Sequence, residues 1–309
     1  MSHLSNPIAT ADQVFTNVTN NVLPLELQDS VRFYTARLTQ AAGILLRLPQ
    51  SITAQANVLL YRYWLVDDIM RHEFSDLSAA VIYLAAKISA SPRSLRSITN
   101  VYAYLISTSS TLSGTTVPEP DPKSYYLSEN TYITKRNKLL HIEGQTLNAL
   151  GFNTHVALPH PLAITYLQTM DVFTSPKTGK EVAKRTIEYL NTALLSPQML
   201  YLTHQPASLA TAAIYLAARD KSVRLPECEW WEVFDCEREE LGFLVVGMGS
   251  LEGVVKREAE RWGKEKGMIS RKDVREEMWK MGIRNENEVE EPLDEEDELN
   301  KLLDARVGA

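Results

Sequence analysis

An eleven-residue apolar block that occurs twice constrains the fold of this chain more than any other feature. Residues 77–87 read LSAAVIYLAAK and residues 209–219 read LATAAIYLAAR, with seven identities at a spacing of 132 residues. His72 and His204 align at the same spacing. Apolar residues fill both faces of the helix that each block predicts, which is typical of a helix at the centre of a domain. We therefore expect two copies of one helical domain, each packed around one buried helix.

The rest of the chain shows helical rather than strand periodicity. In the first copy, the pattern predicts helices over residues 31–48, 51–70, 75–89, 93–106 and 134–150. In the second copy, it predicts helices over residues 161–170, 180–195, 205–219, 226–233 and 237–262. No alternation with a period of two residues extends over a useful length, so we expect an all-α fold of two five-helix repeats.

The predicted helices divide the chain into four regions. We expect an N-terminal extension (1–30), two repeats (31–152 and 153–262), and a charged, partly disordered C-terminal tail (263–309). Within the first repeat, residues 107–130 are rich in serine, threonine and proline and predict a surface loop.

The formal net charge of -7 is unevenly distributed along the 309 residues. Residues 285–309 contain ten acidic residues against Lys301 and Arg306, a net charge of -8, which leaves about +1 for residues 1–284. A nearly neutral body argues against binding of nucleic acid through bulk charge.

The two cysteines, Cys228 and Cys236, form no C-x-x-C motif, so the sequence predicts neither a disulfide framework nor a four-thiolate zinc site. No run approaches the roughly 20 apolar residues of a membrane span, and the N-terminus has no signal-peptide pattern, so we expect a cytosolic or nuclear protein.

The sequence offers no residue pattern typical of an active site. His155 and His160 fall in the linker between the repeats rather than on one helix face, which disfavours a metal pair. A dinucleotide-binding loop requires glycines directly after a strand, whereas the glycines of this chain that come nearest to such a spacing lie within a predicted helix. We therefore expect no catalytic residue, no metal and no cofactor.

Lys87 stands at the end of the first apolar block, where two interpretations are open. A cation in the last turn complements the helix dipole, and Arg219 holds the same place in the second block. Alternatively, the long lysine stem carries the ammonium group to the domain surface, where it can bind a partner.

Four stretches resemble the cyclin boxes of the transcription and splicing cyclins, in particular those of the cyclin L type. They are QAAGILLRLPQ (40–50), LAAKISASPR (84–93), LGFNTHVALPHP (150–161) and IYLAAR (214–219). The resemblance covers about residues 20–262. It implies a tandem cyclin-box fold and a regulatory subunit of a cyclin-dependent kinase, without catalysis of its own.

The resemblance also implies a kinase-binding site in the first repeat. In cyclins, a lysine at the end of the third helix and a glutamate in the fifth bind backbone groups beside the C helix of the kinase; the matching residues are Lys87 and Glu143. Candidates for the surrounding apolar surface, about half of which we expect to be core, are Tyr83, Ile88, Leu139, Leu140 and Leu147.

The implied partner is a PITSLRE-type kinase acting in RNA polymerase II transcription and pre-mRNA splicing, which predicts a nuclear protein. Splicing or transcription factors are further candidate partners, whereas we expect neither a membrane nor direct nucleic-acid contact. One alternative is a cyclin K or cyclin T type subunit of a kinase for the polymerase tail. Another is a cyclin-fold general transcription factor that binds DNA, although such a factor needs a basic face and a zinc ribbon.

The sequence departs from the cyclin L pattern in two places. Ser89 and Ala90 stand where the family commonly has two glutamates, which removes any acidic contact there. An acidic segment stands where cyclin L proteins continue into an arginine-serine-rich tail, so either that tail is lost or the sequence is a fragment.

Overall fold

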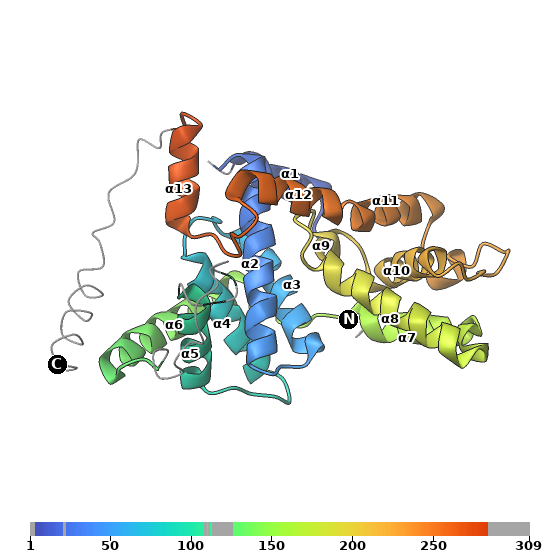
Figure 1. Cartoon of the computed structure of the whole chain (residues 1–309), viewed down its shortest axis with the longest axis horizontal. Helices are drawn as coiled ribbons and strands as arrows, with labels where there is room; N and C mark the ends of the chain where they lie inside the picture. The colour runs from blue at the N-terminus through green and yellow to red at the C-terminus, as the bar shows by residue number, and fades with distance from the viewer. Residues whose placement is uncertain (1–3, 21–22, 108–109, 111, 113–125, 284–309) are drawn as a thin grey trace.

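The computed structural model describes residues 4–20, 23–107, 110, 112 and 126–283 (Figure 1). Every regular element in these residues is a helix, which confirms the predicted all-α class. None of the helices in this described part of the chain is both long and apolar enough to cross a membrane.

The first repeat is built around α4 (Phe74–Lys87). Eleven of its fourteen residues are buried, and it packs against four helices: α2 (Leu25–Leu45), α3 (Gln50–Val66), α5 (Leu95–Ile106) and α6 (Glu129–Ala149). The hydroxyl of Ser78, in the middle of α4, lies 2.6 Å from both Thr39 Oγ1 and the Tyr102 hydroxyl. These bonds satisfy the polar groups that the central helix buries.

The second repeat has the same plan around α10 (Pro206–Asp220), of which eleven of fifteen residues are buried. Its neighbours are α7 (Pro159–Thr169), α8 (Pro176–Ala193), the short α9 (Leu200–Thr203) and α11 (Arg238–Gly249). A single 3-10 turn, η2 (Val172–Thr174), joins α7 to α8. The two apolar blocks detected in the sequence are thus the central helices of two similar domains.

Two helix predictions in the second repeat are wrong. Residues 226–233 form no α-helix and contain only the start of a 3-10 turn, η3 (Glu232–Phe234). Trp230 and Phe234 anchor this segment, whereas Val233 is exposed, so no continuous helical face is buried. Residues 237–262 form two helices instead of one, because the helix is interrupted at Ser250. The hydroxyl of Ser250 donates to the Gly247 carbonyl at 2.8 Å.

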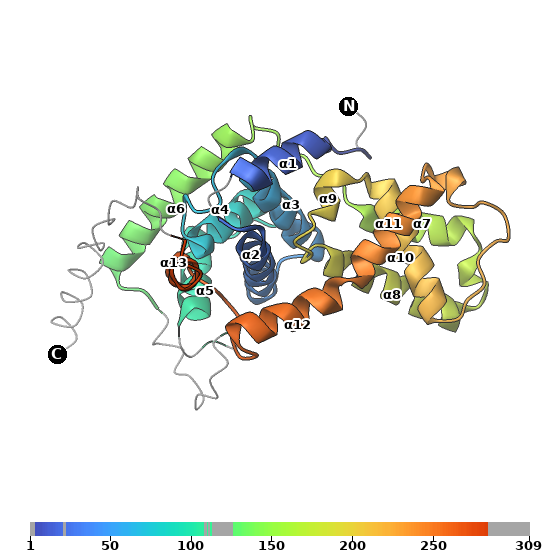
Figure 2. The same cartoon turned by 90° about the horizontal axis from the view of Figure 1, so that it is seen from above.

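The segment before the first repeat contacts the second repeat, and the segment after the second repeat contacts the first. Ala9 N–H donates to the Leu202 carbonyl in the second repeat at 2.8 Å, just before α1 (Ala11–Asn20). After the second repeat, α12 (Leu251–Trp262) runs toward α2, as Figure 2 shows. There, the Ser30 hydroxyl donates to Glu258 at 2.5 Å and accepts from the Trp262 indole at 3.1 Å. The repeats are therefore tied together from both termini.

The segment predicted as a charged tail (263–309) contains a folded helix, α13 (Arg271–Lys280). A capping box between Ser270 and Asp273 starts it, and Val274 and Met278 are buried against the body. Residues 284–309, which include the acidic segment, lie outside the described residues, as does most of the predicted loop 107–130. Two residues of that loop, Ser110 and Leu112, are buried.

Candidate functional site

Lys87 and Glu143 meet across the contact between α4 and α6. Lys87 is the last residue of α4, and its Nζ lies 3.1 Å from Oε1 of Glu143, which stands in the second half of α6. The two side chains differ sharply in exposure, at 56% for Lys87 and 6% for Glu143. The carboxylate is thus fixed inside the repeat, and the ammonium group covers it from the solvent side.

The ring of Tyr83 also contributes to this site. Lys87 Nζ lies 5.7 Å from the centroid of the ring, within the range of a cation–π contact. Because Tyr83 is one helical turn before Lys87, the ring and the ion pair together hold the ammonium group beside the end of α4.

The ion pair leaves hydrogen-bonding capacity for a partner. An ammonium group has three donor positions, and a carboxylate offers two oxygens with several acceptor sites. Lys87 faces solvent, so a partner's carbonyl oxygens can reach it, while amide groups can approach the carboxylate when the lysine stem moves aside. The arrangement is suited to binding the backbone groups at the end of a partner helix.

A second ion pair joins the same two helices. Lys138 Nζ lies 3.2 Å from Asp76 Oδ2, connecting the first half of α6 to the first turn of α4. The sequence pattern does not predict this pair, because nothing in it shows that residues 62 positions apart face one another. Together with the Lys87–Glu143 pair, it bridges α4 and α6 at two points along their contact.

The structure separates the five apolar candidates by burial. Leu139 is part of the core of the first repeat, Ile88 is exposed, and three are partly buried: Tyr83, Leu140 and Leu147. The exposed Ile133, which was not predicted, precedes Leu140 by seven residues, and Leu147 follows Leu140 by seven. A spacing of seven residues places these three side chains on one stripe of α6.

The second repeat does not reproduce the ion pair. Arg219 lies in the last turn of α10, as Lys87 does in α4, yet it forms no ion pair with any residue that the structure describes. Its neighbour Asp220 pairs instead with Arg185 of α8 at 2.9 Å. The candidate site is therefore a property of the first repeat, although the two central helices are similar.

Other groups that could carry chemistry are separated or inactive. No cluster of three or more histidine, cysteine or acidic side chains within the described ranges could hold a metal ion. Burial raises the pKa of the Cys236 thiol to about 12, so it stays protonated at neutral pH and is a poor nucleophile. Burial also lowers the pKa of His72 and of His204, which favours their neutral forms.

Two known structures that contain a chain of similar fold are kinase complexes. A chain of the yeast RNA Pol II CTD kinase CTDK-1 complex matches with a TM-score of 0.63 and 11% identity, over 90% of this chain and 84% of that one. A chain of the CAK complex from Chaetomium thermophilum bound to ATP-gamma-S matches with a TM-score of 0.54 and 14% identity, over 86% and 82%. The all-α architecture of two repeats is the tandem cyclin-box fold.

Sequence comparison finds cyclin L proteins among the relatives of this chain. Cyclin-L1 of Homo sapiens is 32% identical over 220 residues, which are 71% of this chain and 39% of that protein. Cyclin-L2 of Homo sapiens is 31% identical over 240 residues, 77% of this chain and 43% of that protein. No protein-family model matches the sequence. The chain is similar to members of the cyclin family, and the relatives named here are of the cyclin L type. It spans only about two fifths of their length.

Proposed function

We propose that the chain is a cyclin L-like regulatory subunit, not an enzyme, that binds and activates a cyclin-dependent kinase by docking on its C helix. The observation that carries this proposal is the Lys87–Glu143 pair, whose position at the end of α4 and in α6 matches the kinase-binding lysine and glutamate that the cyclin resemblance implies. The pair combines a buried acceptor with an accessible donor, beside an apolar stripe on α6.

Activation follows from the requirements of kinase catalysis. Protein kinases hold the phosphates of ATP correctly only when a strand lysine pairs with a glutamate of the C helix. A cyclin surface that packs against the inward C helix favours that state. The cyclin can shift the population of the C helix only as far as its affinity for the inward state exceeds its affinity for the outward state.

The proposed kinase is of the PITSLRE type, and the proposed setting is RNA polymerase II transcription and pre-mRNA splicing in the nucleus. Similarity to Cyclin-L1 and Cyclin-L2 supports this choice. A second candidate is a subunit of a kinase for the polymerase tail, which the likeness to a chain of the yeast CTD kinase complex favours. Titration of the purified chain against both kinds of kinase distinguishes these candidates by their relative affinities.

The site is tested by replacing both members of the pair. Lys87→Ala alone would leave the buried carboxylate of Glu143 without its cation, which would destabilise the fold and obscure any effect on binding. In the double variant Lys87→Ala/Glu143→Ala, no unpaired charge remains. We expect kinase affinity, measured by titration with a labelled kinase, to fall by at least about tenfold, with a nearly unchanged melting temperature.

A matched control comes from the second repeat. The double variant Arg185→Ala/Asp220→Ala removes an ion pair of similar length at the end of the other central helix. It should bind the kinase as the unmodified chain does. If the Lys87 and Glu143 variant kept full affinity, or if the control lost affinity equally, the assignment of the site would be wrong.

A further inference from the structure

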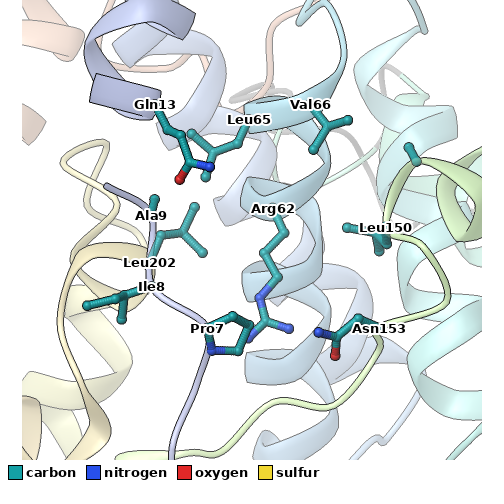
Figure 3. A pocket seen from close by; sticks show the side chains of 11 residues that line it. Pro7, Ile8, Ala9, Gln13, Arg62, Leu65, Val66, Leu150, Asn153 and Leu202 are labelled. Atoms are coloured by element: carbon teal, nitrogen blue, oxygen red, sulfur yellow. The ribbon is translucent and has the colours of Figure 1, made fainter. Parts of the chain in front are cut away.

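A groove lies along α3, with the N-terminal segment on one side of that helix and the residues that follow α6 on the other (Figure 3). Its volume is about 280 Å³, and most of its lining is apolar. Pro7 and Ile8 form one wall, α3 contributes Arg62, Leu65 and Val66, and Leu150 follows α6 on the other side. The groove is separate from the Lys87–Glu143 pair and uses none of its residues.

The wall formed by the N-terminal segment is firmly held. The side chain of Asn6 donates to the Ala157 carbonyl and accepts from the Ala157 amide, both at 2.8 Å. The backbone of Asn6 exchanges two further hydrogen bonds of 3.0 Å with the side-chain amide of Gln205. Four hydrogen bonds to one residue fix the segment that follows it, so the groove is preformed.

Arg62 places a positive charge in this apolar groove. It is only 8% exposed, and its guanidinium donates to the His155 carbonyl at 2.7 Å and to Asn6 Oδ1 at 3.3 Å. Both acceptors are neutral, and Nε has no hydrogen-bond partner. Among the residues that the structure describes, no carboxylate pairs with Arg62.

A second buried arginine, Arg32, has the carboxylate partner that Arg62 lacks. Arg32 is also almost fully buried, but its guanidinium lies 3.5 Å from the Asp29 carboxylate. Buried charges in proteins are normally paired, because an isolated ion loses its hydration without compensation. Arg62 lacks this compensation within the described chain and borders a cavity with room for another group.

We propose that the groove binds an extended segment of a partner protein in which an aspartate or glutamate stands next to an aliphatic side chain. The carboxylate supplies the negative charge that Arg62 lacks, and the aliphatic side chain fills the apolar part beside Leu65 and Leu150. The volume accommodates only one or two side chains, so the recognised segment is short. Ile8 and Val66, both exposed, form the apolar rim that the segment would cover.

An immobilised library of end-blocked hexapeptides, probed with the full chain, tests this proposal. The blocked ends ensure that only side chains supply a carboxylate. We expect the bound peptides to share an acidic residue beside valine, leucine or isoleucine. Replacing the acid of a selected peptide with its amide should weaken binding at least tenfold, measured by fluorescence polarisation.

Substitutions at the rim test the location without disturbing the fold. Val66 is 64% exposed, so Val66→Asp should fold normally and weaken binding of an acidic peptide, whereas Val66→Lys should strengthen it. The matched control is Val233→Asp, at a position 73% exposed in the second repeat, which should leave binding unchanged. Selection of no peptide, selection of peptides without an acid, or insensitivity to Val66→Asp would each overturn the proposal.

The acidic residues 285–309 of the chain are the competing occupant. A chain ending at Ile283 distinguishes the two sources. Equal binding by the full and shortened chains supports a partner segment, whereas binding only by the shortened chain would assign the groove to the chain's own acidic residues. The variant Lys87→Ala/Glu143→Ala should keep its peptide affinity, so this proposal and the kinase proposal can fail separately.

Discussion

Glu143 is a buried acid whose charge is compensated by a single lysine. An ionised carboxylate inside a domain is costly unless a cation or hydrogen-bond donors accompany it. Lys87 supplies the cation from a long, mostly exposed stem, so the pair is stable in the free chain and can still be rearranged. An arginine at position 87 would hold the carboxylate in a more rigid geometry, whereas lysine is a flexible point charge.

His160 gives a residue-level prediction about pH. Its Nε2 lies 3.0 Å from Asn191 Oδ1, and burial lowers its pKa below the ordinary value of 6.5. As the pH falls through 6.5, the unfolded chain takes up a proton on this residue before the folded chain does, so the free energy of unfolding decreases. This loss is complete once the pH lies below the lowered pKa of the folded state.

The variant His160→Gln isolates this effect. Glutamine can still donate to Asn191 but does not titrate. Urea unfolding at pH 8 and pH 5.5 should show a smaller loss of stability for the variant than for the unmodified chain. Equal losses would mean that His160 is protonated as easily in the folded state as in the unfolded state.

The segment between α12 and α13 crosses very close to the first repeat. Gly267 N–H donates to the Leu112 carbonyl at 2.9 Å, and a Cβ on Gly267 would lie only 2.7 Å from Leu112 Cα. Only glycine fits there without moving backbone, because the obstacle is another main chain rather than a flexible side chain. This contact connects the C-terminal segment to the loop that follows α5.

Two glycine substitutions test this element. Gly267→Ala should lower the free energy of unfolding by about 1–3 kcal/mol, because the added methyl group forces the two backbones apart. Gly253→Ala, in α12, meets no atom within 4 Å and should instead raise it by up to about 1 kcal/mol through helix propensity. Both values are measurable by urea unfolding. Two variants of equal stability would contradict the packing described for Gly267.

The elements differ in how far the sequence could predict them. The central helices were found almost to the residue, because apolar residues on every face are an unmistakable signal; α10 was predicted over 205–219 and spans Pro206–Asp220. Helix α13 was missed because it buries only Val274 and Met278, although its capping box, Ser270 and Asp273, is visible in the sequence.

The candidate site was predicted only in part. Lys87 and Glu143 were selected from the cyclin resemblance, but their mutual contact joins residues 56 positions apart and depends on how α4 and α6 cross. The groove beside Arg62 was not predicted at all. It exists because Asn6 bonds to residues 151 and 199 positions away, and a local sequence pattern carries no information about such contacts.

At the scale of the whole molecule, two segments tie the repeats together, one before the first repeat and one after the second. The N-terminal segment bonds to the second repeat through Gln205, and α12 bonds to the first through Glu258 and Ser30. Figures 1 and 2 show where α1 and α12 lie relative to the two repeats. Such ties fix the angle between the repeats, so a kinase bound to the first repeat would also meet the second in a defined orientation.

Hydrogen–deuterium exchange of the full chain, with and without a PITSLRE-type kinase, tests whether the kinase binds at the contact between α4 and α6. We expect slower exchange on kinase binding in the last turn of α4 and in α6 around Glu143, with no change in α10. Protection confined to the second repeat, or unchanged exchange in α4 and α6 in a complex that has formed, would contradict this expectation.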